Sequence, residues 1–137
     1  MLEPGRILLI DCPLVDPPHD KFVVVLCLEP KPLFAFINSG IRPFIQARQF
    51  LLDAQVEIDC RNHRCLHHNS YIDCSEPFTW ATDDFENQLR QQPNRNKGLC
   101  SKAVLTRILE AITAATTISQ RDKAAITAAL MSLVESR

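Results

Sequence analysis

The densest group of chemically capable side chains lies between residues 60 and 68. Thiolates and imidazoles are the ligands that Zn²⁺ prefers in a tetrahedral site, and the side chains that would converge are Cys60, His63, Cys65 and either His67 or His68. Their spacing differs from the common paired zinc motifs, and no second segment closes the site. A Cys-His nucleophile would need a third orienting group, which the sequence does not supply. A zinc site and a polar surface loop therefore remain the two alternatives.

The compartment bears on how these thiols are interpreted. No apolar run approaches the roughly 20 residues that span a bilayer, and the start Met1-Leu2-Glu3-Pro4-Gly5 lacks the basic-then-apolar pattern of a secretory signal. We therefore expect a cytoplasmic protein without membrane contact, in which the six cysteines are free rather than paired in disulfides.

Composition limits the classes of protein further. The chain has 137 residues, of which 46% are hydrophobic and 23% charged, typical of one globular domain. Its net charge of −1 gives no strong, non-specific attraction to nucleic acid. Any nucleic-acid contact must therefore come from a local arrangement of side chains.

Short apolar runs in the first half predict the strands that would position such side chains. The runs are bounded by Pro, Gly, Asn and Ser, and the segment Gln55–Asp59 alternates polar and apolar residues. The Pro-rich segment Pro13–Asp20 is expected to be a loop, and Pro43–Asp53 is either a short helix or a covering loop. The expected strands are Arg6–Cys12, Lys21–Cys27, Leu33–Asn38, Gln55–Asp59 and Asn69–Cys74.

The second half of the chain has helical periodicity. Thr82 is expected to cap a short helix that ends before Pro93, Ser101 a longer one, and Ser119 with Asp122 the last. The two longer helices each carry one apolar stripe and should form an antiparallel pair. The stripes are Leu105, Ile108, Leu109 and Ile112, followed by Ile126, Leu130, Leu133 and Val134.

The order of these elements predicts the fold class. The gaps between the first three strands are too short for crossover helices, which disfavours a parallel sheet. We expect an α+β fold in which residues 1–81 form a small antiparallel β-barrel. Residues 82–137 then form a C-terminal helical hairpin that packs on the barrel or on a dimer partner, as one domain overall.

Several of these segments, over roughly Gly5 to Thr79, resemble the PemK/MazF toxins. The first strand of that family opens with Gly-x-Ile/Val, as Gly5-Arg6-Ile7 does here, and the segment Lys21–Leu26 is similar to the second. Asn38-Ser39 stands where the third strand ends in a polar pair, and Leu66–Thr79 is similar to a later family stretch. The resemblance implies an SH3-like barrel, a cytoplasmic homodimer with an antitoxin-like partner, and endoribonuclease activity on single-stranded RNA without a metal or other cofactor.

The resemblance also implies a site at the strand ends. RNA cleavage of this type needs a base for the 2′-hydroxyl proton, an acid for the leaving oxygen and cations that neutralise the developing charge. The chain departs from the family pattern at Lys21 and Phe78, which replace arginines, and at Glu76, which replaces glutamine. The residues expected in catalysis are Lys21, Ser39, Ser75 and Glu76, and those expected to bind RNA are His19, Asn38, His68 and Asp73.

Two hypotheses follow. In the first, one groove beside Lys21 binds RNA and cleaves it. In the second, favoured by Phe78, the barrel has lost catalysis and serves as a module that binds protein or nucleic acid. The zinc alternative at Cys60, His63, Cys65 and His67 stands apart from both.

Overall fold

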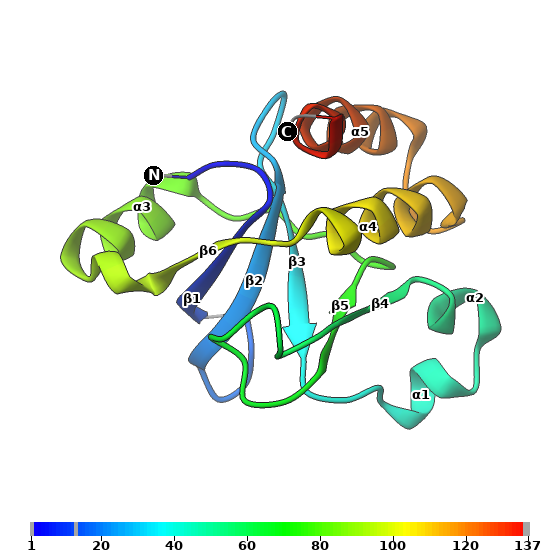
Figure 1. Cartoon of the computed structure of the whole chain (residues 1–137), viewed down its shortest axis with the longest axis horizontal. Coiled ribbons are helices and arrows are strands. Elements are labelled where there is room, and N and C mark those ends of the chain that lie inside the picture. Colours follow the sequence, from blue (N-terminus) through cyan, green and yellow to red (C-terminus); the bar gives the residue numbers. More distant parts are fainter. Residues whose placement is uncertain (1, 13, 136–137) are drawn as a thin grey trace.

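The computed structural model describes residues 2–12 and 14–135, and it shows an α+β structure built on a curled antiparallel sheet (Figure 1). The strand order is β4-β5-β3-β2-β1-β6, and every neighbouring pair is antiparallel. The expected α+β class and antiparallel pairing are therefore confirmed. The strands are β1 (Arg6–Cys12), β2 (His19–Cys27), β3 (Leu33–Asn38), β4 (Gln55–Ile58), β5 (Ser70–Asp73) and β6 (Asn96–Leu99).

Strand β2 lies at the centre of the sheet, between β1 and β3. Its consecutive valines are fully buried because alternate side chains enter two different cores. Val23 and Val25 belong to one core, whereas Val24 and Leu26 belong to the other. The uninterrupted apolar run of β2 is therefore explained by burial on both faces of the sheet.

Helix α3 (Thr82–Gln91) covers one face at the β1 side. Phe85 and Leu89 are buried there against Leu8 and Ile10. The predicted capping role of Thr82 is wrong: the residue before the helix is Ala81, no side chain caps it, and Thr82 is the first helical residue.

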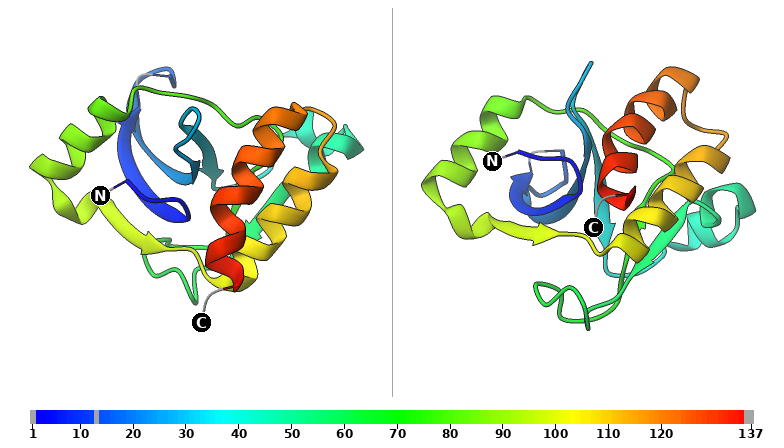
Figure 2. Two further views of the ribbon diagram at one scale, coloured as in Figure 1. Left: turned by 90° about the horizontal axis from the view of Figure 1, so that it is seen from above. Right: turned by 45° about the horizontal axis from the view of Figure 1, so that its top comes forward.

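Helices α4 (Lys102–Ala114) and α5 (Gln120–Glu135) pack against each other and cover the other face of the sheet (Figure 2). The expected cap of α4 is confirmed, since Ser101 Oγ accepts a hydrogen bond from the Val104 N–H at 3.2 Å. Ser119 Oγ likewise accepts one from the Asp122 N–H at 3.1 Å. The larger core therefore lies between the sheet and these two helices.

Three segments differ from the expectation. Strand β2 begins at His19, inside the predicted loop, because His19 and Asp20 pair with the end of β1. Strand β6 was not expected, since Asn96–Leu99 has no alternation of polar and apolar residues; it pairs with β1 beside a bulge. The segment Pro43–Asp53 contains two short helices, and a 3₁₀ turn follows α3. These elements are α1 (Pro43–Gln46), α2 (Gln49–Leu52) and η1 (Pro93–Arg95).

Within residues 2–12 and 14–135, no helix combines the length and the apolar character needed to cross a bilayer.

Candidate nucleic-acid interface

The outer strands of the sheet leave one face partly open to solvent. Helix α3 covers this face only at the β1 side. Along β4 and β5 the residues alternate: Val56, Ile58 and Ile72 are buried towards α4 and α5, whereas Tyr71 and Asp73 remain half-buried. We call this side the open face. Its half-buried or exposed residues are Lys21, Phe36, Asn38, Gln55, Glu57, Tyr71 and Asp73.

The strand register aligns these residues in two adjacent rows. Asn38 pairs with Tyr71, which pairs with Glu57. In the next row Phe36 pairs with Val23, and Gln55 pairs with Asp73. Paired residues in an antiparallel sheet point to the same side. Residues that are far apart in the sequence therefore share one surface.

Lys21 is the cation of this surface. Its Nζ donates a hydrogen bond to Asn38 Oδ1 at 2.9 Å and lies 5.5 Å from the centroid of the Phe36 ring. Burial lowers the pKa of Lys21 from its ordinary value of 10.5, while Cys12 opposes the shift. The ammonium is therefore held in place by an amide and an aromatic ring, and no carboxylate is bonded to it in the described chain.

Aromatic rings lie next to this cation. The Phe36 ring stacks on Phe78, with 4.3 Å between ring centroids and 17° between planes. Phe78 also exchanges backbone hydrogen bonds with Phe34 at 2.8 Å, which fixes it against β3. Phe78, which stands where the family pattern has an arginine, is therefore a packing residue. Together with Tyr71 it gives the open face an aromatic surface beside one lysine, Lys21, and two carboxylates, Glu57 and Asp73.

Asp73 lies on the open face but is engaged by its own neighbours. Its Oδ1 accepts hydrogen bonds from Gln55 Nε2 at 2.9 Å, from the Ser75 N–H at 3.0 Å and from Ser75 Oγ at 2.6 Å. Ser75 is buried, and its carbonyl accepts a hydrogen bond from Thr117 Oγ1 at 2.6 Å. Ser75 therefore joins the sheet to the α4–α5 link.

Ser39 and His68 lie elsewhere, in a pocket of about 210 Å³ that also reaches Lys21. Strand alternation directs the Lys21 side chain to the open face, whereas Phe22 and Ile37, which line this pocket, point to the opposite side. His68 Nδ1 lies 2.9 Å from the Asn69 carbonyl oxygen. Lys21 thus lines this pocket and also contributes its ammonium to the open face.

Glu76 lies in a third place. It lines a pocket of about 370 Å³ together with Ser75, Phe44 and Asp122. This pocket shares no lining residue with the pocket that Lys21 lines. His19 is exposed at the start of β2, where its Nδ1 lies 2.8 Å from the Pro17 carbonyl oxygen. The structure therefore brings Lys21, Asn38 and Asp73 to one face and places Ser39 and His68 in a pocket that Lys21 also lines. Ser75 and Glu76 lie in another pocket.

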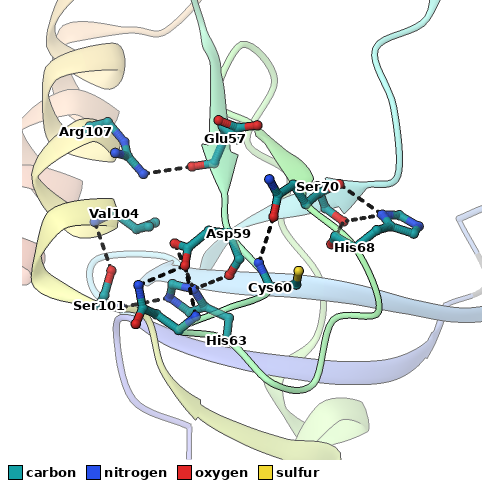
Figure 3. A network of polar contacts seen from close by, with 11 residues as sticks. Glu57, Asp59, Cys60, His63, His68, Ser70, Ser101, Val104 and Arg107 are labelled. Carbon is teal, nitrogen blue, oxygen red and sulfur yellow. Dashed lines mark hydrogen bonds and ion pairs between the residues drawn. The ribbon is translucent and has the colours of Figure 1, made fainter.

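The structure does not bring the residues of the zinc alternative together. Within residues 2–12 and 14–135, no three His, Cys, Asp or Glu side chains gather so as to hold a metal ion. His63 is buried: its Nδ1–H donates to the Asp59 carbonyl at 2.8 Å, and its Nε2 accepts the Ser101 N–H at 3.0 Å (Figure 3). Both ring nitrogens are thus occupied. The residues predicted as zinc ligands were Cys60, His63, Cys65 and His67.

Four residues of the open face were missed by the sequence analysis, and two of them, Phe36 and Tyr71, are aromatic. Both lie in segments predicted correctly as strands, and each occupies a position two residues from an expected RNA-binding residue, Asn38 or Asp73. The period of two along each strand was therefore the available signal. Neither segment alone indicates that β3 pairs with β5. This pairing places the residues of both strands on one face.

Comparison of the sequence with models of known protein families and with curated proteins gives no match. The fold and the open face thus define an α+β protein whose sheet carries a lysine beside aromatic rings, and the resemblance described above rests on the quoted residues alone.

Proposed function

We propose that this chain is a PemK/MazF-like protein with an SH3-like barrel that binds single-stranded RNA across the open face of its sheet. The observation that carries the proposal is the shared face of Lys21, Phe36, Asn38 and Tyr71. Single-stranded nucleic acids are bound where aromatic rings accept unpaired bases and cations accept phosphates. The net charge of −1 requires such a local site.

Each residue has a chemical role in this proposal. The Tyr71 ring is a surface on which a base can stack, and the Lys21 ammonium contacts a phosphate. Phe36 is stacked on Phe78 and supports that ammonium. Asn38 carries an amide that can read a base edge. Phe36 rests on Phe78 at 4.3 Å between centroids, so its orientation is fixed before RNA arrives. A preorganised platform avoids part of the ordering entropy of binding.

Fluorescence anisotropy with a labelled single-stranded RNA tests the proposal. We expect Tyr71→Ala to weaken binding by about 1–3 kcal/mol because one stacking surface is lost. Lys21→Ala should reduce the slope of log affinity against log salt by about 0.7, the value for one phosphate contact on a single strand. The matched control is Lys123→Ala, which removes a lysine of α5 whose Nζ donates to the Thr113 carbonyl at 2.9 Å.

The proposal also predicts which RNA should compete for the open face. Double-stranded RNA should compete poorly, because its bases are stacked on one another and cannot reach Tyr71. If neither single- nor double-stranded RNA binds at low salt, or if Tyr71→Ala and Lys123→Ala behave alike, RNA binding on this face is refuted.

Metal-independent RNA cleavage is the second candidate, and the presence of Asp73 on the same face as Lys21 favours it. Asp73 would take the 2′-hydroxyl proton as that oxygen bonds to phosphorus, and the 5′-oxygen would leave and take a proton from water. Lys21 would neutralise the charge that develops on phosphorus. Cleavage of a labelled RNA in the presence of a chelator tests it. Asp73→Asn should abolish cleavage and keep binding. Binding without cleavage by the native chain would leave the non-catalytic module as the function.

A further inference from the structure

Strand β4 lies at one end of the sheet, so among the described strands it has a neighbour on one side only. Just before β4 and just after β5, the Cys74 N–H donates to the Ala54 carbonyl at 2.9 Å, which makes these two residues a hydrogen-bonded pair. Such pairs alternate with non-bonded pairs along an antiparallel ladder. The backbone N–H and C=O groups of Gln55 and Glu57 therefore point away from β5, towards the free edge.

One side chain covers part of this edge. Arg107 of α4 donates a hydrogen bond from Nη2 to the Glu57 carbonyl at 2.9 Å (Figure 3). This bond agrees with a Glu57 carbonyl that points out of the sheet. Arg107 is exposed, so water can replace the bond at little cost. A competing N–H donor could therefore displace Arg107 from the edge.

An open groove of about 390 Å³ lies between this edge and α4. Its lining includes Ala111 and Ala114 of α4, whose small side chains leave room beside β4. A second pocket, of about 210 Å³, shares Asp53 and both alanines with the groove and reaches the exposed ring of Phe50. The helix side of the groove is therefore apolar and leads to an exposed aromatic side chain.

The charges around the groove indicate which kind of segment could occupy it. The groove is lined by three carboxylates, Asp53, Glu57 and Glu110, and by one cation, Arg107. All four residues are exposed. Within residues 2–12 and 14–135, none of these carboxylates forms an ion pair. A basic segment would therefore be attracted to the groove, and an acidic one repelled.

We infer that the edge of β4 binds an extended, basic segment of another protein as an additional antiparallel strand. Strand addition of this kind gains affinity from backbone hydrogen bonds and specificity from alternate side chains. Residues of the segment opposite Gln55 and Glu57 point to the same side as those two side chains, where basic groups meet Glu57. The intervening residues point towards Ala111 and Ala114, where apolar groups fit. The inference does not rest on RNA binding.

Titration of the labelled peptide acetyl-Lys-Val-Lys-Val-Lys-Val-amide, followed by fluorescence anisotropy, tests the inference. The native chain should bind this peptide and should not bind the same peptide with glutamate in place of lysine. Glu57→Gln should weaken binding about threefold, because one exposed ion pair is lost. The matched control is Glu135→Gln, which changes an exposed glutamate of α5 and should bind as the native chain does.

Arg107→Ala should have the opposite effect and strengthen binding about threefold or more. The substitution frees the Glu57 carbonyl and removes the cation of the groove. Lys102→Ala is the matched control, since it removes the same charge from an exposed position of α4 that does not line the groove. This control should leave the affinity for the peptide unchanged.

Methylation of the peptide amides distinguishes strand addition from simple attraction between charges. In the antiparallel arrangement the lysine N–H groups bond to β4, whereas the valine N–H groups face away from it. Methylation of the lysine amides should abolish binding, and methylation of the valine amides should preserve it.

Three results would each overturn the inference. They are no binding of the unmethylated peptide, equal effects of the two methylations, and an Arg107→Ala variant that binds no more tightly than Lys102→Ala. Self-association of Arg107→Ala without peptide binding would assign the edge to a second copy and would also overturn it. Circular dichroism of every variant establishes that it is folded.

Discussion

His63 supports the start of α4 through a hydrogen bond that few other side chains could supply. Its Nε2 accepts the N–H of Ser101, the residue whose own Oγ caps the helix. The neutral ring provides a donor and an acceptor at once, so it joins Asp59 to Ser101 across the core boundary. The residue that looked like a metal ligand in the sequence therefore connects a loop to a helix.

Replacing His63 by leucine should lower the free energy of unfolding by about 1–3 kcal/mol, because the part-buried Ser101 N–H loses its partner. Urea denaturation measures this. The matched control is His67→Leu, an exposed histidine of the same loop, which should change stability by no more than about 0.5 kcal/mol. Equal effects of the two substitutions would contradict the role given to His63.

The buried thiols predict a loss of stability in alkali. Burial raises the pKa of Cys100 from its ordinary value of 9.0 to about 12. The unfolded chain loses this proton near its ordinary pKa, whereas the folded chain keeps it. The folded chain then binds more protons, so the free energy of unfolding falls as pH rises from about 9 to about 12, by about 1.4 kcal/mol per pH unit.

Denaturation at several alkaline pH values tests this expectation by comparing the native chain with Cys100→Ala. The variant should lose stability less steeply than the native chain. Burial also raises the pKa of Cys74, and it lowers that of Lys21, which acts in the opposite direction. Both groups remain in the variant, so the difference in slope reports Cys100. Parallel curves would show that the thiol ionises alike in the two states.

Individual site residues were predictable only in part. Lys21, Asn38 and Asp73 were recognised because polar side chains stand out at strand ends, and the structure gathers them on one face. Ser39 and Glu76 satisfied the same criterion, yet they line two other pockets. Strand alternation decides between the sides of a sheet, and the pairing register decides which side chains become neighbours.

At the scale of elements, Gly5 determines how the chain enters β1. Its φ is +84°, a backbone conformation that residues with a Cβ rarely adopt. Its N–H donates to the Val25 carbonyl at 2.7 Å, and its carbonyl accepts the Cys100 N–H at 2.9 Å. An added Cβ would lie 2.8 Å from Leu133 Cδ1 on α5. The first strand, the last strand and the last helix thus meet at one residue without a side chain.

Gly5→Ala should therefore lower the free energy of unfolding by about 1–3 kcal/mol through backbone strain and displacement of Leu133. Gly40→Ala is the matched control, since a Cβ at Gly40 would meet no heavy atom within 4 Å. Thermal unfolding of the two variants measures the difference. If Gly5→Ala is as stable as Gly40→Ala, the close approach of α5 to the start of β1 is wrong.

Elements with a strong apolar signal were predictable from the sequence, and elements held by their neighbours were not. Strands β1 and β3 match the expected bounds because their apolar runs end at polar or proline residues. Strand β6 carries Asn96, Lys97 and Gly98, so its extended form depends on pairing with β1 rather than on its own residues. The C-terminal helices were predictable because caps and apolar stripes agree.

At the scale of the whole molecule, the two faces of the sheet have different roles. Helices α4 and α5 close one face and bury most of the core. The other face is closed by α3 only at the β1 side, which leaves β3, β5 and β4 to present polar and aromatic residues.

Amide chemical-shift mapping of a short single-stranded RNA on the isotopically labelled chain is the most direct test of the open face. The account predicts that the largest shifts fall on Lys21, Phe36, Asn38, Tyr71 and Asp73, and that the Tyr71→Ala variant loses them. Shifts confined to the Glu76 pocket or to the Ser39 and His68 pocket, or no shifts at saturating RNA, would contradict it.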